Sequence, residues 1–192
     1  MKKIIVFALI LSVILCLPSC GDTNSQEFDT LNKLSSDIEY VFYTIDIETT
    51  DENGMTVKEI YNVTNTNGQI KATYRIERLN SFTVDGNNIY LPTDQVTVTE
   101  GTLTESASES SLALPKFNFS ASSLSVTSAV NYGTYSYMTA NITSMYGFMG
   151  FDFSDSSNHT LTVNYNENQL NSLCICYTTS NGNTTYLTYS FQ

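Results

Sequence analysis

The chain has 192 residues with 19 acidic and 8 basic side chains, which give a net charge of −11 at neutral pH. A surface this acidic repels nucleic acid and anionic lipid headgroups, so we expect no nucleic-acid partner. The 13 tyrosines and 10 phenylalanines argue against a disordered chain and favour strands. The length suits one domain with a hydrophobic core.

The first residues have the pattern of a cleaved export signal. Lys2 and Lys3 precede a nearly continuous apolar run over residues 4–17. That run is shorter than the roughly 20 residues needed to cross a bilayer core. Basic residues, a short apolar run and a small residue such as Ser19 together predict a signal peptide. An ordinary secretory signal and an uncleaved membrane helix are the alternatives.

Leu17-Pro18-Ser19-Cys20 resembles the lipobox of bacterial lipoproteins. The resemblance implies cleavage after Ser19 and a lipid (diacylglycerol, with an added acyl chain such as palmitate) on Cys20. Two acyl chains suffice for stable anchoring, here on the extracytoplasmic face of the cell membrane. We therefore divide the chain into a signal peptide (1–19), a lipidated tether with a short helix (20–37) and an antiparallel β domain (38–192).

Residues 24–37 are predicted to form the short helix. Phe28, Leu31 and Leu34 recur at three-residue spacing, and Asn24 with Glu27 matches a capping box. The segment is either a helix packed over a sheet or a flexible tether from the membrane.

The period then changes to two, which is typical of half-buried strands, over residues 41–48, 55–63 and 70–76. The intervening Asn-Gly pairs predict hairpin turns. A two-residue turn at Asn67-Gly68 pairs Tyr61 with Tyr74. The preceding hairpin needs a three-residue loop, 52–54, with Gly54 in the left-handed conformation. A two-residue turn there would place the apolar side chains on the wrong face.

The C-terminal third repeats this pattern over residues 161–165, 173–177 and 187–191, with turns at 166–169 and 180–182. The middle of the chain is less regular. We expect a turn at Asp85-Gly86, a strand containing Val96 and Val98, a polar loop at 105–111, and strands within 117–126 and 132–153.

These elements predict a mainly β fold of about eight to eleven strands. We expect a single antiparallel sheet domain, either a curved half-barrel or a sandwich, with a short N-terminal helix. The hairpin order and the anchor resemble half-barrel lipoproteins of the LolA/LppX type. That resemblance implies a bent sheet and a helix around an apolar cavity for lipid, and it assigns no site residues.

The side chains for acid–base or nucleophilic chemistry are few, so we expect no catalytic residue, no metal, no cofactor and no enzyme. His159 is the only histidine. Asp152 and Asp155 near it fit a solvated turn better than a cation site. Cys174 and Cys176 are expected to be buried free thiols, since residues two apart on one strand fit a disulfide poorly.

Five residues are candidate ligand contacts. In the register above, Glu59 and Arg78 lie diagonally on the apolar face, where we expect them to meet, either as a structural ion pair or at the mouth of a ligand cavity. Tyr146, Phe148 and Phe151 belong to the most apolar stretch, 145–153, which suits either a core strand or an adaptable pocket.

Two functions follow from these patterns. The first is a membrane-anchored, non-enzymatic binding module for an apolar or amphiphilic ligand such as a lipid, which requires a cavity on the sheet. The second is a structural or interaction protein of the envelope, similar to an adhesin, which requires an exposed apolar patch or an unprotected edge strand.

Overall fold

The computed structural model describes residues 23–37, 40–79, 83–85, 88–90, 96–153 and 155–192. These residues form two helices, α2 (Thr23–Asp37) and α3 (Met145–Met149), and eleven strands. The strands are β1 (Phe42–Thr50), β2 (Thr56–Thr66), β3 (Gln69–Leu79), β4 (Thr83–Asp85), β5 (Asn88–Tyr90), β6 (Val96–Ser106), β7 (Leu124–Asn131), β8 (Ser136–Ile142), β9 (Ser156–Tyr165), β10 (Leu170–Thr179) and β11 (Thr184–Phe191).

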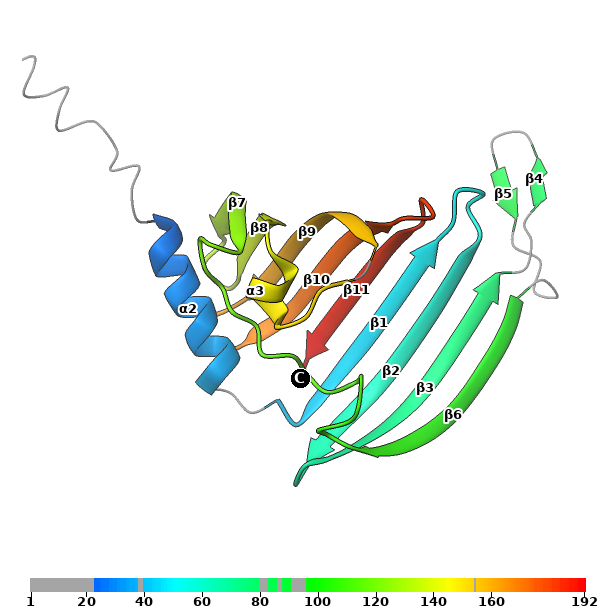
Figure 1. Cartoon of the computed structure of the whole chain (residues 1–192), viewed down its shortest axis with the longest axis horizontal. Helices are drawn as coiled ribbons and strands as arrows, with labels where there is room; N and C mark the ends of the chain where they lie inside the picture. The colour runs from blue at the N-terminus through cyan, green and yellow to red at the C-terminus, as the bar shows by residue number, and fades with distance from the viewer. Residues whose placement is uncertain (1–22, 38–39, 80–82, 86–87, 91–95, 154) are drawn as a thin grey trace, which may run out of the picture.

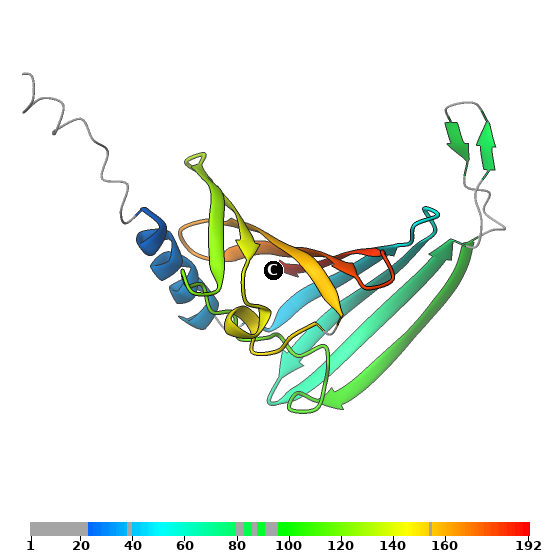
Figure 2. The ribbon, with the colours of Figure 1, turned by 45° about the horizontal axis from the view of Figure 1, so that its top comes forward.

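Nine strands form one open antiparallel sheet in the order β6-β3-β2-β1-β11-β10-β9-β8-β7, while β4 and β5 form a separate hairpin (Figure 1). The sheet curves into a half-barrel, and the helices and irregular segments lie on one side of it (Figure 2). The prediction of a mainly β domain is confirmed, as a curved half-barrel and not a sandwich.

The predicted hairpin registers are confirmed. Thr66 pairs with Gln69 across a two-residue turn in which Asn67 and Gly68 both have positive φ. Ile45 pairs with Tyr61 across a three-residue loop, and Gly54 has a φ of 79°. The loop at 180–182 has the same form, since Gly182 has a φ of 81°. A residue with a Cβ would be strained at Gly54, Gly68 and Gly182, whereas asparagine, as at Asn67, tolerates this conformation.

Two meanders meet in the middle of the sheet. The first contains β1, β2, β3 and β6, and the second runs from β7 to β11. Only the antiparallel pairing of β1 with β11 joins them, from Tyr43↔Phe191 to Thr50↔Thr184. This junction connects segments from opposite ends of the chain, and we call it the β1–β11 seam.

The core lies between α2, α3 and one face of the sheet, which we call the inner face. It contains residues of the second meander and also Tyr43, Ile45, Val63, Ile70 and Ala72 of the first. Phe28, Leu31 and Leu34 of α2 are buried, so the predicted helix packs against the sheet and is not a free tether. Segment 107–123 crosses the same face. Asn32 of α2 exchanges two hydrogen bonds with the backbone of Phe119, at 2.7 and 2.8 Å, and the Tyr43 hydroxyl donates to the Leu112 carbonyl at 2.8 Å.

Three predictions in the middle of the chain are wrong in detail. Residues 145–149 form helix α3 and not a strand, with Ser144 as N-cap and Gly150 as a left-handed C-cap. The strand expected within 117–126 begins only at Leu124. The polar loop expected from residue 105 starts after β6 ends at Ser106. The expected turn at Gly86 lies outside the described residues, although Asp85 pairs with Asn88.

The structure leaves the anchor untested. Cys20 and the predicted signal peptide, 1–19, lie outside the described residues. Within the described part of the chain, neither helix has the length and apolar character needed to cross a membrane.

Candidate functional site

The inner face of the first meander differs from that of the second because no described helix covers it (Figures 1 and 2). Part of this face is buried, at Tyr43, Ile45, Val63, Ile70 and Ala72. Six other apolar side chains there are neither fully buried nor fully exposed. They are Ile47 on β1, Val57 and Tyr61 on β2, Tyr74 and Ile76 on β3, and Leu103 on β6. We call these six residues the open inner face. A half-buried apolar layer on a concave sheet is a surface that a ligand can complete.

A polar pair interrupts this apolar layer. The Tyr61 hydroxyl donates a hydrogen bond to Glu59 Oε2 at 2.6 Å, and both side chains come from β2. Burial and the neighbouring carboxylate raise the pKa of Tyr61 to about 12. The phenol therefore stays protonated at physiological pH and continues to donate to the carboxylate.

The expected contact between Glu59 and Arg78 is not formed. The register places both where predicted, with Glu59 opposite Ile76 and Arg78 opposite Val57. However, Glu59 binds Tyr61, two residues further along its own strand, and Arg78 is exposed. The ion pairs among the described residues lie on the other face of the sheet, between Lys58 and Asp46 and between Arg75 and both Glu77 and Glu100.

A glycine on the edge strand makes room for Tyr74. Gly101 of β6 pairs with Tyr74 of β3, and a Cβ at position 101 would lie 2.6 Å from Tyr74 Cζ. The ring therefore lies over the bare backbone of β6. Its centroid is 6.2 Å from that of Tyr61, with the rings tilted by 41°. Gly101 and the two tyrosines together shape the polar part of the open inner face.

The three aromatic candidates from 145–153 do not share one surface. Phe148 is fully buried, with its ring 5.4 Å from Phe119 and 5.7 Å from Phe117, measured between centroids. Tyr146 is 66% exposed on the opposite side of α3, and Phe151 is 42% exposed. Phe148 is a core residue in this fold, and the ligand role predicted for all three stays a prediction.

The reactive side chains do not form a catalytic arrangement among the described residues. His159 Nε2 lies 2.7 Å from Ser156 Oγ, but that hydroxyl donates its hydrogen bond to the Phe153 carbonyl, so it accepts one from the ring N–H. Burial lowers the pKa of His159. Asp152 accepts a hydrogen bond from the Tyr146 amide at 3.0 Å.

Cys174 and Cys176 are free, as predicted. They are only half-buried, because they lie on the outer face of β10 and not in the core. Burial raises the pKa of the Cys174 thiol, which keeps it protonated.

A cavity lies beside α2 and not over the open inner face. It has a volume of about 760 Å³ between the first turns of α2 and the edge strand β7. Its lining is mostly polar, and Glu27 lies in it, where burial raises the pKa of the carboxyl group. Glu27 accepts a hydrogen bond from the Tyr165 hydroxyl and so ties α2 to the end of β9. The sequence analysis missed this contact because its partners are far apart in the chain.

Comparison with known proteins finds likeness only in overall structure. No family model and no curated protein matches the sequence. A LolA superfamily protein from Nitrosomonas europaea is 9% identical, with 88% of this chain and 91% of that chain covered and a TM-score of 0.32. A de novo designed fluorescence-activating β-barrel is 9% identical over 78% of this chain and 91% of that chain, with a TM-score of 0.24. A redesigned β-barrel bound to DFHBI is 12% identical over 77% and 91%, with a TM-score of 0.21.

These likenesses are weak.

Proposed function

We propose that this protein is a membrane-anchored, extracytoplasmic and non-enzymatic binding module that holds an apolar or amphiphilic ligand against the open inner face. One observation supports it most: six half-buried apolar side chains share a concave sheet face that no described helix covers. Each 100 Å² of apolar surface that a ligand covers would contribute about 2.5 kcal/mol to binding.

The polar groups within this face favour an amphiphile over a purely apolar molecule. Glu59 accepts a hydrogen bond from Tyr61, so the carboxylate keeps this partner when a hydrocarbon chain lies beside the pair. Arg78 at the end of the same face is exposed and is available to a ligand headgroup. A fatty acid or a lysophospholipid has both a hydrocarbon chain and a polar headgroup.

Native mass spectrometry tests this proposal directly. The Cys20→Ser protein, which lacks the acylation site, is incubated with oleate or with lysophosphatidylcholine and compared with its Ile76→Asn variant. Ile76 faces the site, whereas Val98 lies on the opposite face of β6, so Val98→Asn is the matched control. We expect a ligand-bound mass for the parent and the control and its loss in Ile76→Asn. Absence of a bound mass with both ligands would reject the proposal.

The anchor is part of the same proposal. An acylated Cys20 would hold the domain at the membrane, and residues 21 and 22 are a short link to α2. A lipid ligand held against the sheet would then stay close to the bilayer from which it came.

The edge strand β6 supports a second function, that of an interaction protein. β6 is eleven residues long, it ends the sheet, and it contains neither lysine nor proline. Val98 on it is 44% exposed. Such an edge can pair with a strand of a partner protein. Light scattering and cross-linking of the wild type and of Val98→Lys would test this, because a charge on the edge should prevent the association.

A further inference from the structure

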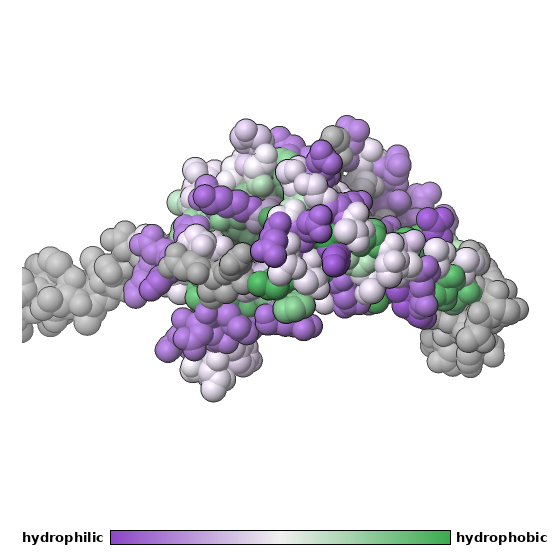
Figure 3. All heavy atoms as spheres, turned by 90° about the horizontal axis from the view of Figure 1, so that it is seen from below, coloured by the Kyte–Doolittle hydropathy of each residue, from purple (hydrophilic) through white to green (hydrophobic). Residues whose placement is uncertain are grey.

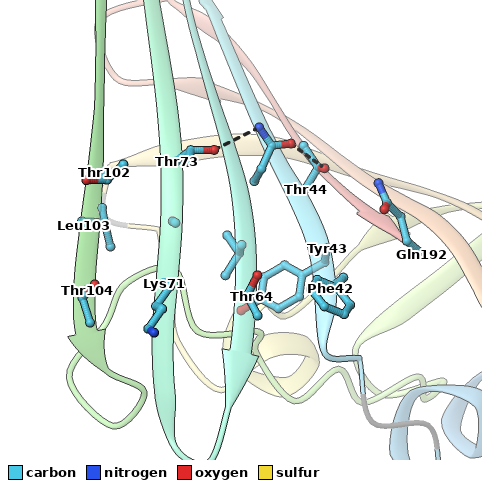
Figure 4. A pocket seen from close by; sticks show the side chains of 13 residues that line it. Phe42, Tyr43, Thr44, Thr64, Lys71, Thr73, Thr102, Leu103, Thr104 and Gln192 are labelled. Carbon is cyan, nitrogen blue, oxygen red and sulfur yellow. Dashed lines mark hydrogen bonds between the residues drawn. The ribbon is translucent and has the colours of Figure 1, made fainter.

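A second hollow lies on the outer face of the first meander, behind the open inner face (Figure 4). Its volume is about 420 Å³, and side chains of β1, β2, β3 and β6 line it. Strand residues alternate between faces, and of the six residues of the open inner face only Leu103 also borders this hollow. A ligand bound here would therefore be independent of the proposed function.

Two cross-strand rows form the hollow. One row runs Thr44, Asn62, Thr73 and Thr102 from β1 to β6. The neighbouring row begins at Phe42 and contains Lys71. Asn62 is central: its amide oxygen lies 3.4 Å from the Thr44 hydroxyl, and its amide nitrogen lies 3.5 Å from Thr73 Oγ1.

These side chains keep much of their hydrogen-bonding capacity. The contacts of Asn62 are long, and an amide offers two donor hydrogens and two acceptor lone pairs. Both Asn62 and Thr73 are exposed. The hollow thus offers a group of hydroxyls around one amide that can donate and accept at the same time.

Phe42 gives the hollow one apolar wall. Its side chain is 54% exposed, whereas five other phenylalanines, Phe28, Phe117, Phe119, Phe148 and Phe191, are buried. The hollow is also bordered by four apolar residues of the inner-face register, Tyr43, Val63, Ala72 and Leu103. The negative face of an aromatic ring attracts polarised C–H groups.

The charges in the hollow restrict the ligand further. None of its lining residues is acidic, although the chain has 19 acidic residues, so the hollow is unsuited to a metal ion or a polycation. Lys71 is its only basic residue, which is too few to hold a polyphosphate or a nucleic acid. The hydroxyl and amide groups and the Phe42 ring instead match a ligand with many hydroxyls and one face of C–H groups.

We propose that the outer hollow binds an oligosaccharide. Phe42 stacks on one sugar ring, and Asn62 with the flanking threonines binds its hydroxyls. The protein would thereby attach to a glycan on the face opposite the open inner face.

A glycan microarray probed with the labelled protein tests this proposal. The informative variants are Phe42→Ala and Asn62→Ala. Tyr186→Ala is the control, since Tyr186 is a 45% exposed aromatic residue of the outer face that does not line the hollow. We expect a defined set of glycans to bind the wild type and the control. Loss of the ring is expected to weaken binding by about tenfold.

Circular dichroism first establishes whether each variant is folded. If Phe42→Ala does not fold, Asn62→Ala alone tests the proposal. The proposal is overturned if the wild type binds no glycan on the array, or if both variants bind as the wild type does. Ligand binding at the open inner face is measured separately with Ile76→Asn, so failure of one proposal leaves the other standing.

Discussion

Replacing Phe148 by alanine distinguishes a core residue from a ligand contact. The side chain is fully buried among Phe117 and Phe119. A buried aromatic side chain removes about 150–250 Å² from water, which at about 25 cal/mol per Å² corresponds to roughly 4–6 kcal/mol. Alanine retains a small part of that contact, and comparable substitutions cost about 3–5 kcal/mol of unfolding free energy.

The neighbouring Tyr146 is the matched control. It belongs to the same helix but is 66% exposed, so Tyr146→Ala should change stability by about 0.5 kcal/mol or less. Urea unfolding followed by far-ultraviolet circular dichroism measures both variants. With a denaturant slope of about 2 kcal/mol per molar, Phe148→Ala should lower the midpoint by about 2 M.

A loss below about 1 kcal/mol in Phe148→Ala would refute this reasoning. If ligand binding by that variant fell sharply at the same time, Phe148 would be a ligand contact that reaches solvent in a conformation other than the one described.

Three further predictions concern the anchor and the open inner face. Cys20→Ser should move the protein from the membrane to the soluble fraction and abolish labelling by a palmitate analogue; unchanged fractionation would contradict the lipobox interpretation. Folding raises the pKa of Tyr61 to about 12. The protonated Tyr61 side chain should therefore contribute fully to the stability of the folded state below pH 10, and this contribution should be lost as the pH rises through 12. Glu59→Gln should lower that pKa, measured by nuclear magnetic resonance of labelled tyrosine, and an unchanged pKa would exclude the hydrogen bond as a cause. Gly101→Ala should displace the Tyr74 ring, with a cost of about 1–3 kcal/mol in stability and weaker ligand binding, whereas wild-type behaviour would show that the ring can move freely.

The hairpins could be predicted from sequence because their determinants are local. Asn67-Gly68 allows one turn geometry, and the alternation on either side then fixes which residues face each other. The loop ending at Gly54 followed from the same reasoning, since a two-residue turn would have placed the apolar side chains on the wrong face.

Other features depended on contacts that sequence patterns do not contain. The apolar stretch 145–149 fits a strand or a helix by composition, and only Ser144 and Gly150 at its ends mark it as a helix. Glu59 was expected to meet Arg78 because opposite charges lay on one face, but it accepts a hydrogen bond from Tyr61 of its own strand, while Arg78 is exposed. The outer hollow likewise depends on the pairing of four strands, which no single segment reveals.

The β1–β11 seam has a consequence for the order in which the chain folds. Within each meander, neighbouring strands are close in sequence, and hairpins of this kind form in microseconds. The seam instead closes a loop from Tyr43 to Phe191, at a larger entropic cost. We therefore expect each meander to fold separately and the strands β1 and β11 to pair last. This pairing step should set the overall folding rate. Two polypeptides divided within 107–123 should accordingly recognise each other and rebuild the whole sheet.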